Sequence, residues 1–294
     1  MARNRLLVTG GSGLLGSSIV RAAAEDFEVF ATYHTNPVSL PGGECIYLDI
    51  RNENEVASII GRLKPNLVIH TAALAGVDYC EDHSEEARIL NIKGAENMAR
   101  ASEGSKFIYI STDSVFDGEK GMYSEDDSPS PLSVYSKTKL EGELSVQAIL
   151  PDSIIVRTAF YGWSLFNRTS LAEWVFYNLK DGNRINMFTD VIFSPIITDD
   201  LAGLLLDMYN SGLSGVYNVA GSEQCSKYAF GMEIARTFGF DTGFISPGSV
   251  NDMVFKAPRA RNLSLNTGKI ERDLNKKLPD LKSGIERFRD IMPN

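Results

Sequence analysis

Three regularly spaced glycines near the start of the chain constrain its fold more than any other feature. Gly10, Gly13 and Gly16 directly follow the short apolar run 6–8 and open a helical pattern over 14–24. The first glycine permits a tight turn, the second lets a pyrophosphate approach the backbone, and the third allows close packing of helix on strand. Free N–H groups and the positive end of the helix then attract phosphates. The pattern predicts a dinucleotide-binding turn; the alternative is a glycine turn with a purely structural role.

The first 160 residues alternate short apolar runs with helical patterns. Apolar runs that continue without alternation indicate strands buried on both faces, which is typical of a parallel sheet covered by helices. We therefore predict an α/β fold, a doubly wound parallel Rossmann-type sheet with right-handed crossovers. The expected strands are 6–8, 29–33, 45–48, 67–70, 107–110 and 154–156, and the expected helices are 14–24, 53–63, 87–101 and 134–150.

The alternation loosens after about residue 160. Helical patterns at 171–180, 201–209 and 229–238 and a short strand at 216–219 are expected here, with proline-containing loops between them. No low-complexity linker or internal repeat occurs. We expect residues 1–160 to form the dinucleotide-binding part. Residues 161–294 should form mainly a smaller C-terminal substrate-binding lobe, with some segments returning to the first part. The two parts should make one integrated domain.

Charge and composition exclude several classes of protein. The chain has 29 Lys and Arg against 38 Asp and Glu, a formal charge of −9, without a basic cluster that would suit nucleic acid or an anionic membrane. Three cysteines and three histidines show no disulfide or metal-ligand spacing, so we expect no metal site. The N-terminal apolar run is too short for a signal peptide, and no run reaches membrane-spanning length, so we expect a cytoplasmic protein without membrane contact.

The ends of the second and third predicted strands bear on the choice of cofactor. The segment 32–36 lacks the acidic residue that binds the ribose 2′-hydroxyl in NAD-selective sites, which favours NADP(H) and leaves NAD(H) possible, although no arginine follows there either. Asp49 and Ile50, after the third strand, could contact the adenine. The alternative is that Asp49 caps the helix that starts near Glu53.

A tyrosine and a lysine at helical spacing indicate acid–base chemistry. Tyr135 and Lys139 lie four residues apart, so on a helix their side chains share one face. A nearby cation is expected to lower the pKa of a tyrosine, which is otherwise too high for efficient proton transfer. The hydroxyl of Thr112, after the fifth strand, can donate to a substrate carbonyl oxygen. The alternative for the Tyr–Lys pair is a solvated helix face.

Several segments together resemble the extended short-chain dehydrogenase/reductases, and among these the dTDP-4-dehydrorhamnose reductases. The resemblance covers nearly the whole chain. It rests on the segments 8–16, 71–73, 111–118, 134–143, 216–221 and 258–272.

The resemblance implies a role for each matching residue. Thr112 would orient the substrate carbonyl with Asp113 beside it, Tyr135 would donate the proton, and Lys139 would hold the nicotinamide ribose. Where the rhamnose-forming enzymes have a tryptophan that stacks on the sugar, this chain has Phe160, with Trp163 as an alternative. The cofactor-binding positions would be Gly10, Gly13, Leu14, Leu15, Gly16, Asp49, Ile50, Ala72, Ala73, Leu74, Tyr135 and Lys139.

Three further residues fall in matching segments. Asn91 would support the backbone of the active site. Arg259 and Arg261 could pair with a nucleotide diphosphate or form surface salt bridges.

The activity that the resemblance implies is NAD(P)H-dependent reduction of the 4-keto group of a nucleotide-linked deoxysugar. The partner would be the nucleotide-sugar substrate, and a homodimer is possible. One alternative is a non-catalytic, nicotinamide-cofactor-binding regulatory subunit of the methionine adenosyltransferase type. Another is a sugar-nucleotide epimerase or dehydratase, because Asp113 places an acid next to Thr112.

Overall fold

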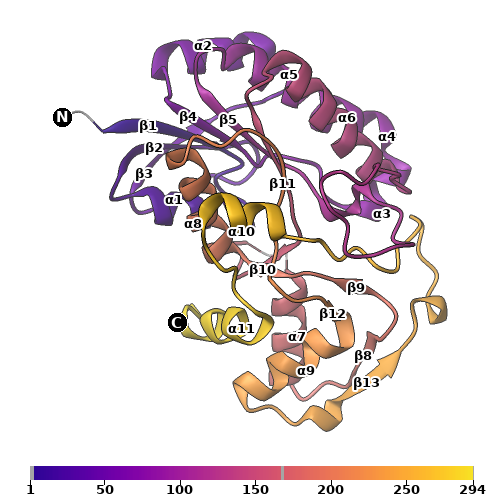
Figure 1. Ribbon diagram of the computed structural model, residues 1–294. Helices are drawn as coiled ribbons and strands as arrows, with labels where there is room; N and C mark the ends of the chain where they lie inside the picture. Colours follow the sequence, from indigo (N-terminus) through magenta and orange to yellow (C-terminus); the bar gives the residue numbers. More distant parts are fainter. Residues whose placement is uncertain (1–2, 167–168, 294) are drawn as a thin grey trace.

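The buried apolar runs form one parallel sheet of seven strands in the order β11-β6-β5-β4-β1-β2-β3. The computed structural model describes residues 3–166 and 169–293 (Figure 1). The predicted doubly wound α/β fold is confirmed. The strands are β1 Asn4–Thr9, β2 Phe27–Tyr33, β3 Gly43–Tyr47, β4 Leu67–His70, β5 Lys106–Ile110, β6 Ile154–Arg157 and β11 Gly215–Asn218.

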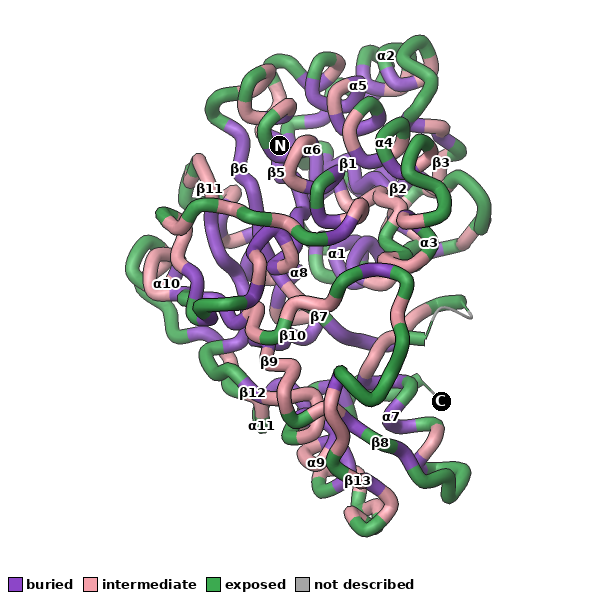
Figure 2. The backbone as a smooth tube through the Cα atoms, turned by 90° about the vertical axis from the view of Figure 1, so that its right-hand side faces the viewer, coloured by how far each residue is buried: buried purple, intermediate pink, exposed green. Residues whose placement is uncertain are grey.

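Helices cover both faces of this sheet. Alternate residues of β1 enter opposite cores: Leu6 and Val8 pack under one layer of helices and Leu7 under the other, and all three are fully buried. The strands accordingly form the inner part of the molecule in Figure 2. One layer contains α1 Leu14–Ala23 and α8 Thr198–Asn210; the other contains α2 Glu53–Leu63, α5 Gly94–Ala101 and α6 Val134–Ile149.

The strand order places a ligand site at one edge of the sheet. β1 lies between β2 and β4. The sheet grows from β1 to β3 in one direction and from β4 onwards in the other, so the strand order reverses next to β1. Ligands of doubly wound folds bind at such a switch point, outside the carboxyl ends of the strands. The glycine turn follows β1 and therefore lies at this position.

The helical region predicted at 87–101 is interrupted. It consists of α4 Ser84–Arg88, the π-helical turn η1 Ile89–Lys93 and then α5, with α3 Val77–Asp82 before them. π-turns widen a helix locally and are common at functional sites. Here the turn carries Asn91, whose side chain is buried.

The second half of the chain builds a smaller lobe with its own aromatic core. Trp163, Phe176, Phe230 and Phe288 are among its buried members. Its helices are α7 Leu171–Lys180, α9 Lys227–Phe238 and α11 Leu281–Asp290, with the short turns η3 Thr242–Phe244 and η4 Val250–Asp252. Its paired strands are β8 Ile185–Phe188 with β13 Ile245–Gly248, and β9 Ile192–Phe193 with β12 Cys225–Ser226.

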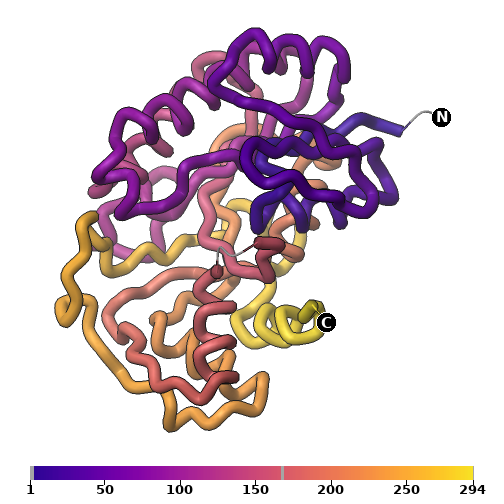
Figure 3. Tube along the Cα trace, turned by 180° about the vertical axis from the view of Figure 1, so that it is seen from behind, coloured from indigo at the N-terminus to yellow at the C-terminus, as the bar shows by residue number. Residues whose placement is uncertain are grey.

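Later segments also return to the sheet. α8 packs on α1, where the Ser18 hydroxyl donates to Thr198 at 2.9 Å, and β11 completes the sheet beside β6. α10 Gly268–Leu274 packs on β11. The pair β7 Phe160–Tyr161 and β10 Ile196–Ile197 connects the sheet with the lobe, which lies below it in the view from behind (Figure 3). Among the described residues, no helix is both long and apolar enough to cross a membrane.

A buried ion pair joins α6 to the end of β6. The guanidinium of Arg157 contacts the carboxylate of Glu143 at 2.8 and 3.2 Å, and their side chains are 6% and 1% exposed. Removing one partner of such a pair leaves an uncompensated buried charge. We expect Arg157→Leu to lower the free energy of unfolding by about 3 kcal/mol, measured by urea denaturation.

The pair Arg236–Glu233 on α9, 3.5 Å apart and with an exposed arginine, provides the control. Arg236→Leu should cost less than about 1 kcal/mol. Equal losses in the two variants would contradict the stabilising role given to the buried pair.

Candidate active site

The glycine turn has the conformation that a phosphate-binding turn requires. Gly10 has a φ of +67°, which favours glycine, and a Cβ there would lie 2.9 Å from the hydroxyl oxygen of Thr71. A Cβ on Gly16 would collide with the carbonyl of Gly10. The turn is closed by the Gly13 N–H, which donates to the Gly10 carbonyl at 2.8 Å. Steric clashes alone therefore explain why two of the three positions, 10 and 16, are glycine.

The turn leaves backbone donors free for a ligand. α1 begins at Leu14, and within the described chain no side chain caps it. Because the first N–H groups of a helix have no partner within the helix, those of Leu14 and Leu15 can face an anion. The residues present therefore fit the pyrophosphate of a dinucleotide.

Asn91 holds the segment that follows β4. Its amide accepts from the Leu74 N–H at 2.8 Å and donates to the Leu74 carbonyl at 3.2 Å and to the Thr138 hydroxyl at 3.0 Å. Ala72, in the same segment, donates its N–H to Thr9 at 3.3 Å. This is the backbone support expected of Asn91, and it ties the segment to the helix that carries Tyr135.

Asp49 does not cap α2. That helix is capped by Asn52, which accepts from the N–H groups of two following residues, so the capping alternative for Asp49 is wrong. The Asp49 carboxylate instead binds the guanidinium of Arg51, which holds the pKa of Asp49 below its usual value. The side chain of Ile50 points into the core next to Gly94, so a contact of Ile50 with an adenine would involve its backbone.

The start of α6 places the tyrosine. Ser133 caps the helix by accepting from the Ser136 N–H at 3.2 Å, and the carboxylate of Glu81 accepts from the Val134 N–H at 2.8 Å. Tyr135 thus lies in the first turn, and its side chain lines the same cavity as Thr112. Burial raises the pKa of Tyr135 well above its usual value, and the nearby hydroxyl of Thr112 opposes this rise only partly.

Lys139 lies one turn beyond Tyr135 but does not lower the pKa of the tyrosine. Its ammonium donates to the Ile110 carbonyl at 2.8 Å and lies 4.1 Å from the centre of the Tyr109 ring. Burial lowers the pKa of Lys139 to about 7, against the opposing charge of Glu143. The expected lowering of the tyrosine pKa is therefore wrong, because burial of Tyr135 raises its pKa instead. Tyr135 is protonated at neutral pH, as a proton donor must be.

A cavity of about 830 Å³ opens between the sheet and the lobe. Phe160 contributes a ring that is 36% exposed. Trp163 lies instead in the lobe core, stacked on Phe288 with centroids 4.1 Å apart, so the alternative that it replaces Phe160 is wrong. From the sheet side the lining includes Thr112, Asp113 and Tyr135; from the lobe it includes Phe160, Trp174, Arg184, Phe193, Lys227 and Arg259.

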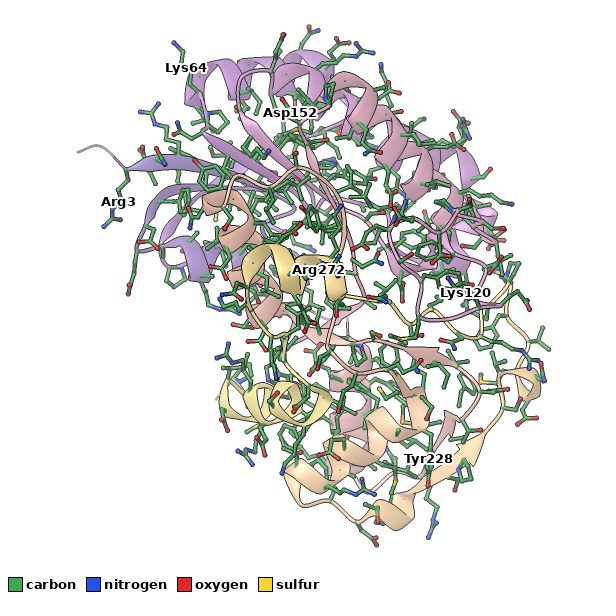
Figure 4. The ribbon with its side chains drawn as sticks, in the orientation of Figure 1. Arg3, Lys64, Lys120, Asp152, Tyr228 and Arg272 are labelled. Atoms are coloured by element: carbon green, nitrogen blue, oxygen red, sulfur yellow. The ribbon has the colours of Figure 1, made fainter. Side chains whose placement is uncertain are left out.

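Lys227 is a cavity residue that the sequence did not reveal. It is the first residue of α9, and its ammonium lies 3.2 Å from the centre of the Phe193 ring. Burial lowers the pKa of Lys227 to about 8 and raises that of Asp113 to about 6, and each charge opposes the shift of the other. Tyr228, the next residue, is labelled on the lobe in Figure 4. No local pattern links a helix start to a distant strand end, so only the tertiary structure could identify the pair.

Arg259 and Arg261 differ in position. The Arg259 guanidinium contacts the Asp78 carboxylate at 2.6 Å, lies 4.5 Å from the centre of the Phe255 ring and lines the cavity. Arg261 is exposed and donates to Asn251 at 3.0 Å. Of the two arginines, Arg259 is therefore the one placed to meet a ligand in the cavity.

The raised pKa of Asp113 predicts a pH-dependent cost to stability. The folded-state pKa of about 6 lies above the ordinary value of 3.8, so the cost is absent at low pH and complete above about pH 6. Asp113→Asn removes this cost. The stability of the variant relative to the wild type should rise by roughly 1 kcal/mol between pH 5 and pH 8, measured by urea denaturation. A difference that does not change with pH would contradict the burial of a charged Asp113.

The chain is similar to known proteins over nearly its whole length. The family described as the RmlD substrate binding domain matches residues 4–293. The probable low-salt glycan biosynthesis reductase Agl14 of Haloferax volcanii is 31% identical over 287 residues, which cover 95% of each chain. Methionine adenosyltransferase 2 subunit beta of Xenopus tropicalis is 31% identical over 278 residues, 91% of this chain and 82% of that protein.

A solved structure shows the same arrangement. The dTDP-4-dehydrorhamnose reductase of Bacillus anthracis, in complex with NADP, has a TM-score of 0.88 and 26% identity, covering 99% of this chain and 100% of that chain. The family match and these similarities span nearly every residue, from the glycine turn to the last helix. The protein therefore belongs to the RmlD substrate-binding-domain family.

Proposed function

We propose that the protein is an NAD(P)H-dependent oxidoreductase that reduces the 4-keto group of a nucleotide-linked deoxysugar, with dTDP-4-dehydrorhamnose as the first candidate. The observation that carries this proposal is that two hydroxyl-bearing side chains, Tyr135 and Thr112, line the wall of one cavity. Two such donors can meet one carbonyl oxygen. The Bacillus anthracis relative is a dTDP-4-dehydrorhamnose reductase with bound NADP, and the Haloferax relative is a probable reductase.

The reaction needs a proton donor where negative charge develops. The nicotinamide supplies the hydride when it is bound. Tyr135, protonated at neutral pH, gives its proton to the carbonyl oxygen as that oxygen becomes an alkoxide. Thr112 donates a hydrogen bond to the same oxygen and stabilises its charge. Lys139, whose ammonium donates to the Ile110 carbonyl, would bind the ribose of the cofactor.

A chain of hydroxyls fixes the position of Thr112. Its hydroxyl lies 2.9 Å from that of Ser114, which accepts from Ser136 at 3.0 Å, and Ser136 in turn lies 2.8 Å from Ser133. Ser133 and Ser136 are buried, so this chain exchanges little with solvent. The capping residue of α6 thereby holds the oxygen-binding hydroxyl in place.

Asp113 and Lys227 supply an acceptor and a donor beside the reaction centre. A carboxylate accepts hydrogen bonds from sugar hydroxyls, and an ammonium donates to them. Phe160 offers an apolar ring on which a sugar face can stack. These three side chains suit a hydroxylated ring with an apolar face, which is the chemistry of a deoxysugar.

Tyr135→Phe tests the proposal directly. Loss of the proton donor should lower kcat by about 100-fold or more. Binding of NADPH, followed by its fluorescence, should be unchanged because the glycine turn is intact. Tyr177→Phe, an exposed tyrosine on α7, is the control and should retain full turnover.

Two results would oppose the proposal. Undiminished turnover by Tyr135→Phe would remove the tyrosine from the mechanism. A wild-type protein that binds NADPH, reduces none of a panel of dTDP-4-keto sugars and binds a methionine adenosyltransferase catalytic subunit would instead support the alternative of a regulatory subunit; the Xenopus relative is named as subunit beta of methionine adenosyltransferase 2. A cytoplasmic location and a homodimer stay predictions.

Lys227→Met tests the sugar contact. Loss of one charged hydrogen bond to the substrate should raise KM for the nucleotide sugar by about 10- to 100-fold, with a smaller change in kcat. Lys227→Arg should recover part of the loss. Lys180→Met, on the exposed side of α7, is the control. An unchanged KM in Lys227→Met would exclude the lysine from substrate binding.

A further inference from the structure

The end of β2 has a cation that the sequence does not place there. β2 and β3 pair in parallel with Tyr33 opposite Tyr47, and the Leu48 N–H donates to the Tyr33 carbonyl at 3.0 Å. The chain after β3 therefore runs beside the chain after β2. As a result, the Nη2 atom of Arg51 lies 3.2 Å from the Nε2 atom of His34.

This place adjoins the glycine turn. The Gly11 N–H donates to the Thr32 carbonyl at 2.8 Å, which fixes the turn against the last residues of β2. In dinucleotide-binding folds the adenosine ribose lies between this turn and the end of the second strand. His34 is two residues beyond Thr32, so His34 and Arg51 lie on the side where the 2′ position of that ribose is expected.

Arg51 is held with donors to spare. Its Nε and Nη2 atoms contact the two oxygens of Asp49 at 2.8 and 2.7 Å, and Nη2 also reaches His34. A guanidinium carries five N–H donors. Over the residues that the structure describes, no acceptor is bonded to the two donors on Nη1. The side chains of Arg51 and His34 are 37% and 48% exposed, so a ligand can reach them.

Asp49 sets how strongly this cation attracts an anion. Its carboxylate fixes the guanidinium in one orientation and also neutralises it, since the charges of Asp49 and Arg51 sum to zero. A planar guanidinium with two free donors matches two oxygens of a phosphate. Its partial neutralisation means that a cofactor with a plain 2′-hydroxyl is not strongly disfavoured.

We propose that Arg51, positioned by His34 and Asp49, binds the 2′-phosphate of NADP(H), and that Asp49 limits the preference for this phosphate over a 2′-hydroxyl. The inference rests on the proposed function for the presence of a dinucleotide, and it adds the residues that select between its two forms. The pairing of β2 with β3 supplies the arginine that the sequence segment after β2 lacks.

The test compares ligands that differ only in the 2′-phosphate. Isothermal titration calorimetry of the full chain would measure Kd for NADP⁺ and NAD⁺, and for the fragments 2′,5′-ADP and 5′-AMP. For each pair, the preference ratio is the Kd of the ligand without the 2′-phosphate divided by the Kd of the ligand with it. In this ratio the contributions of the adenine and the 5′-phosphate cancel. The wild type should bind 2′,5′-ADP more tightly than 5′-AMP.

Arg51→Gln should weaken NADP⁺ and 2′,5′-ADP by about 10-fold or more and change NAD⁺ and 5′-AMP by no more than about twofold. His34→Ala should reduce the ratio less. Asp49→Asn should raise it, because the guanidinium loses its counter-charge. Arg51→Lys keeps the charge without the planar fork, should give an intermediate ratio, and serves if Arg51→Gln folds poorly. Arg62→Gln, an exposed arginine in the last turn of α2, is the matched control.

These binding measurements test the phosphate site separately from the proposed reductase activity, because they need neither a sugar substrate nor turnover. An Arg51→Gln ratio equal to that of the wild type would overturn the inference, and so would a fall in the ratio with Asp49→Asn. Equal wild-type affinities for 2′,5′-ADP and 5′-AMP would also overturn it. A protein without reductase activity whose ratio responds to Arg51 and Asp49 would refute the proposed function and uphold the phosphate site.

Discussion

Burial of one parallel sheet on both faces is the constraint on which the rest of this structure depends. Because every strand runs the same way, the carboxyl ends of β1, β2, β3, β4 and β5 meet at one edge. The apolar strand interiors cannot bind a polar ligand, so polar side chains collect where the strands end. The glycine turn, the segment after β4 and Thr112 all owe their proximity to this arrangement rather than to nearness in sequence.

Desolvation, more than net charge, sets the electrostatics of the site. The chain carries a formal charge of −9, yet its candidate binding groups are single cations placed beside single carboxylates: Arg51 with Asp49, Lys227 near Asp113, Arg259 with Asp78. Burial keeps Tyr135 protonated and moves the pKa values of Lys139 and Asp113 towards neutrality. An acidic protein can thus bind an anionic ligand through local dipoles and a few oriented donors.

Most of the fold could be predicted from periodicity, and the errors have physical causes. Short apolar runs predicted all seven strands of the sheet, and the glycine spacing predicted the turn after β1. The π-turn within the helical region predicted at 87–101 has no sequence signature, because it depends on how Asn91 packs against the segment after β4. A lowered pKa is expected for Tyr135 when only its helical neighbour Lys139 is taken into account. Burial of the ring, which the sequence does not show, raises this pKa instead. The sequence does not decide whether Phe160 or Trp163 faces the sugar, because Trp163 stacks on Phe288, a residue far away in the sequence.

The sequence by itself determined the sheet, the glycine turn and the shared face of Tyr135 and Lys139, because each follows from contacts within a few residues or from the period of apolar side chains. The tertiary structure alone decided which distant charges meet. Arg51 reaches His34 only because β3 pairs with β2 in one register, and Lys227 lines the same cavity as Asp113 only because the lobe that carries α9 lies beside the end of β5. Such pairings depend on the relative placement of whole elements, and short-range sequence patterns carry no record of that placement.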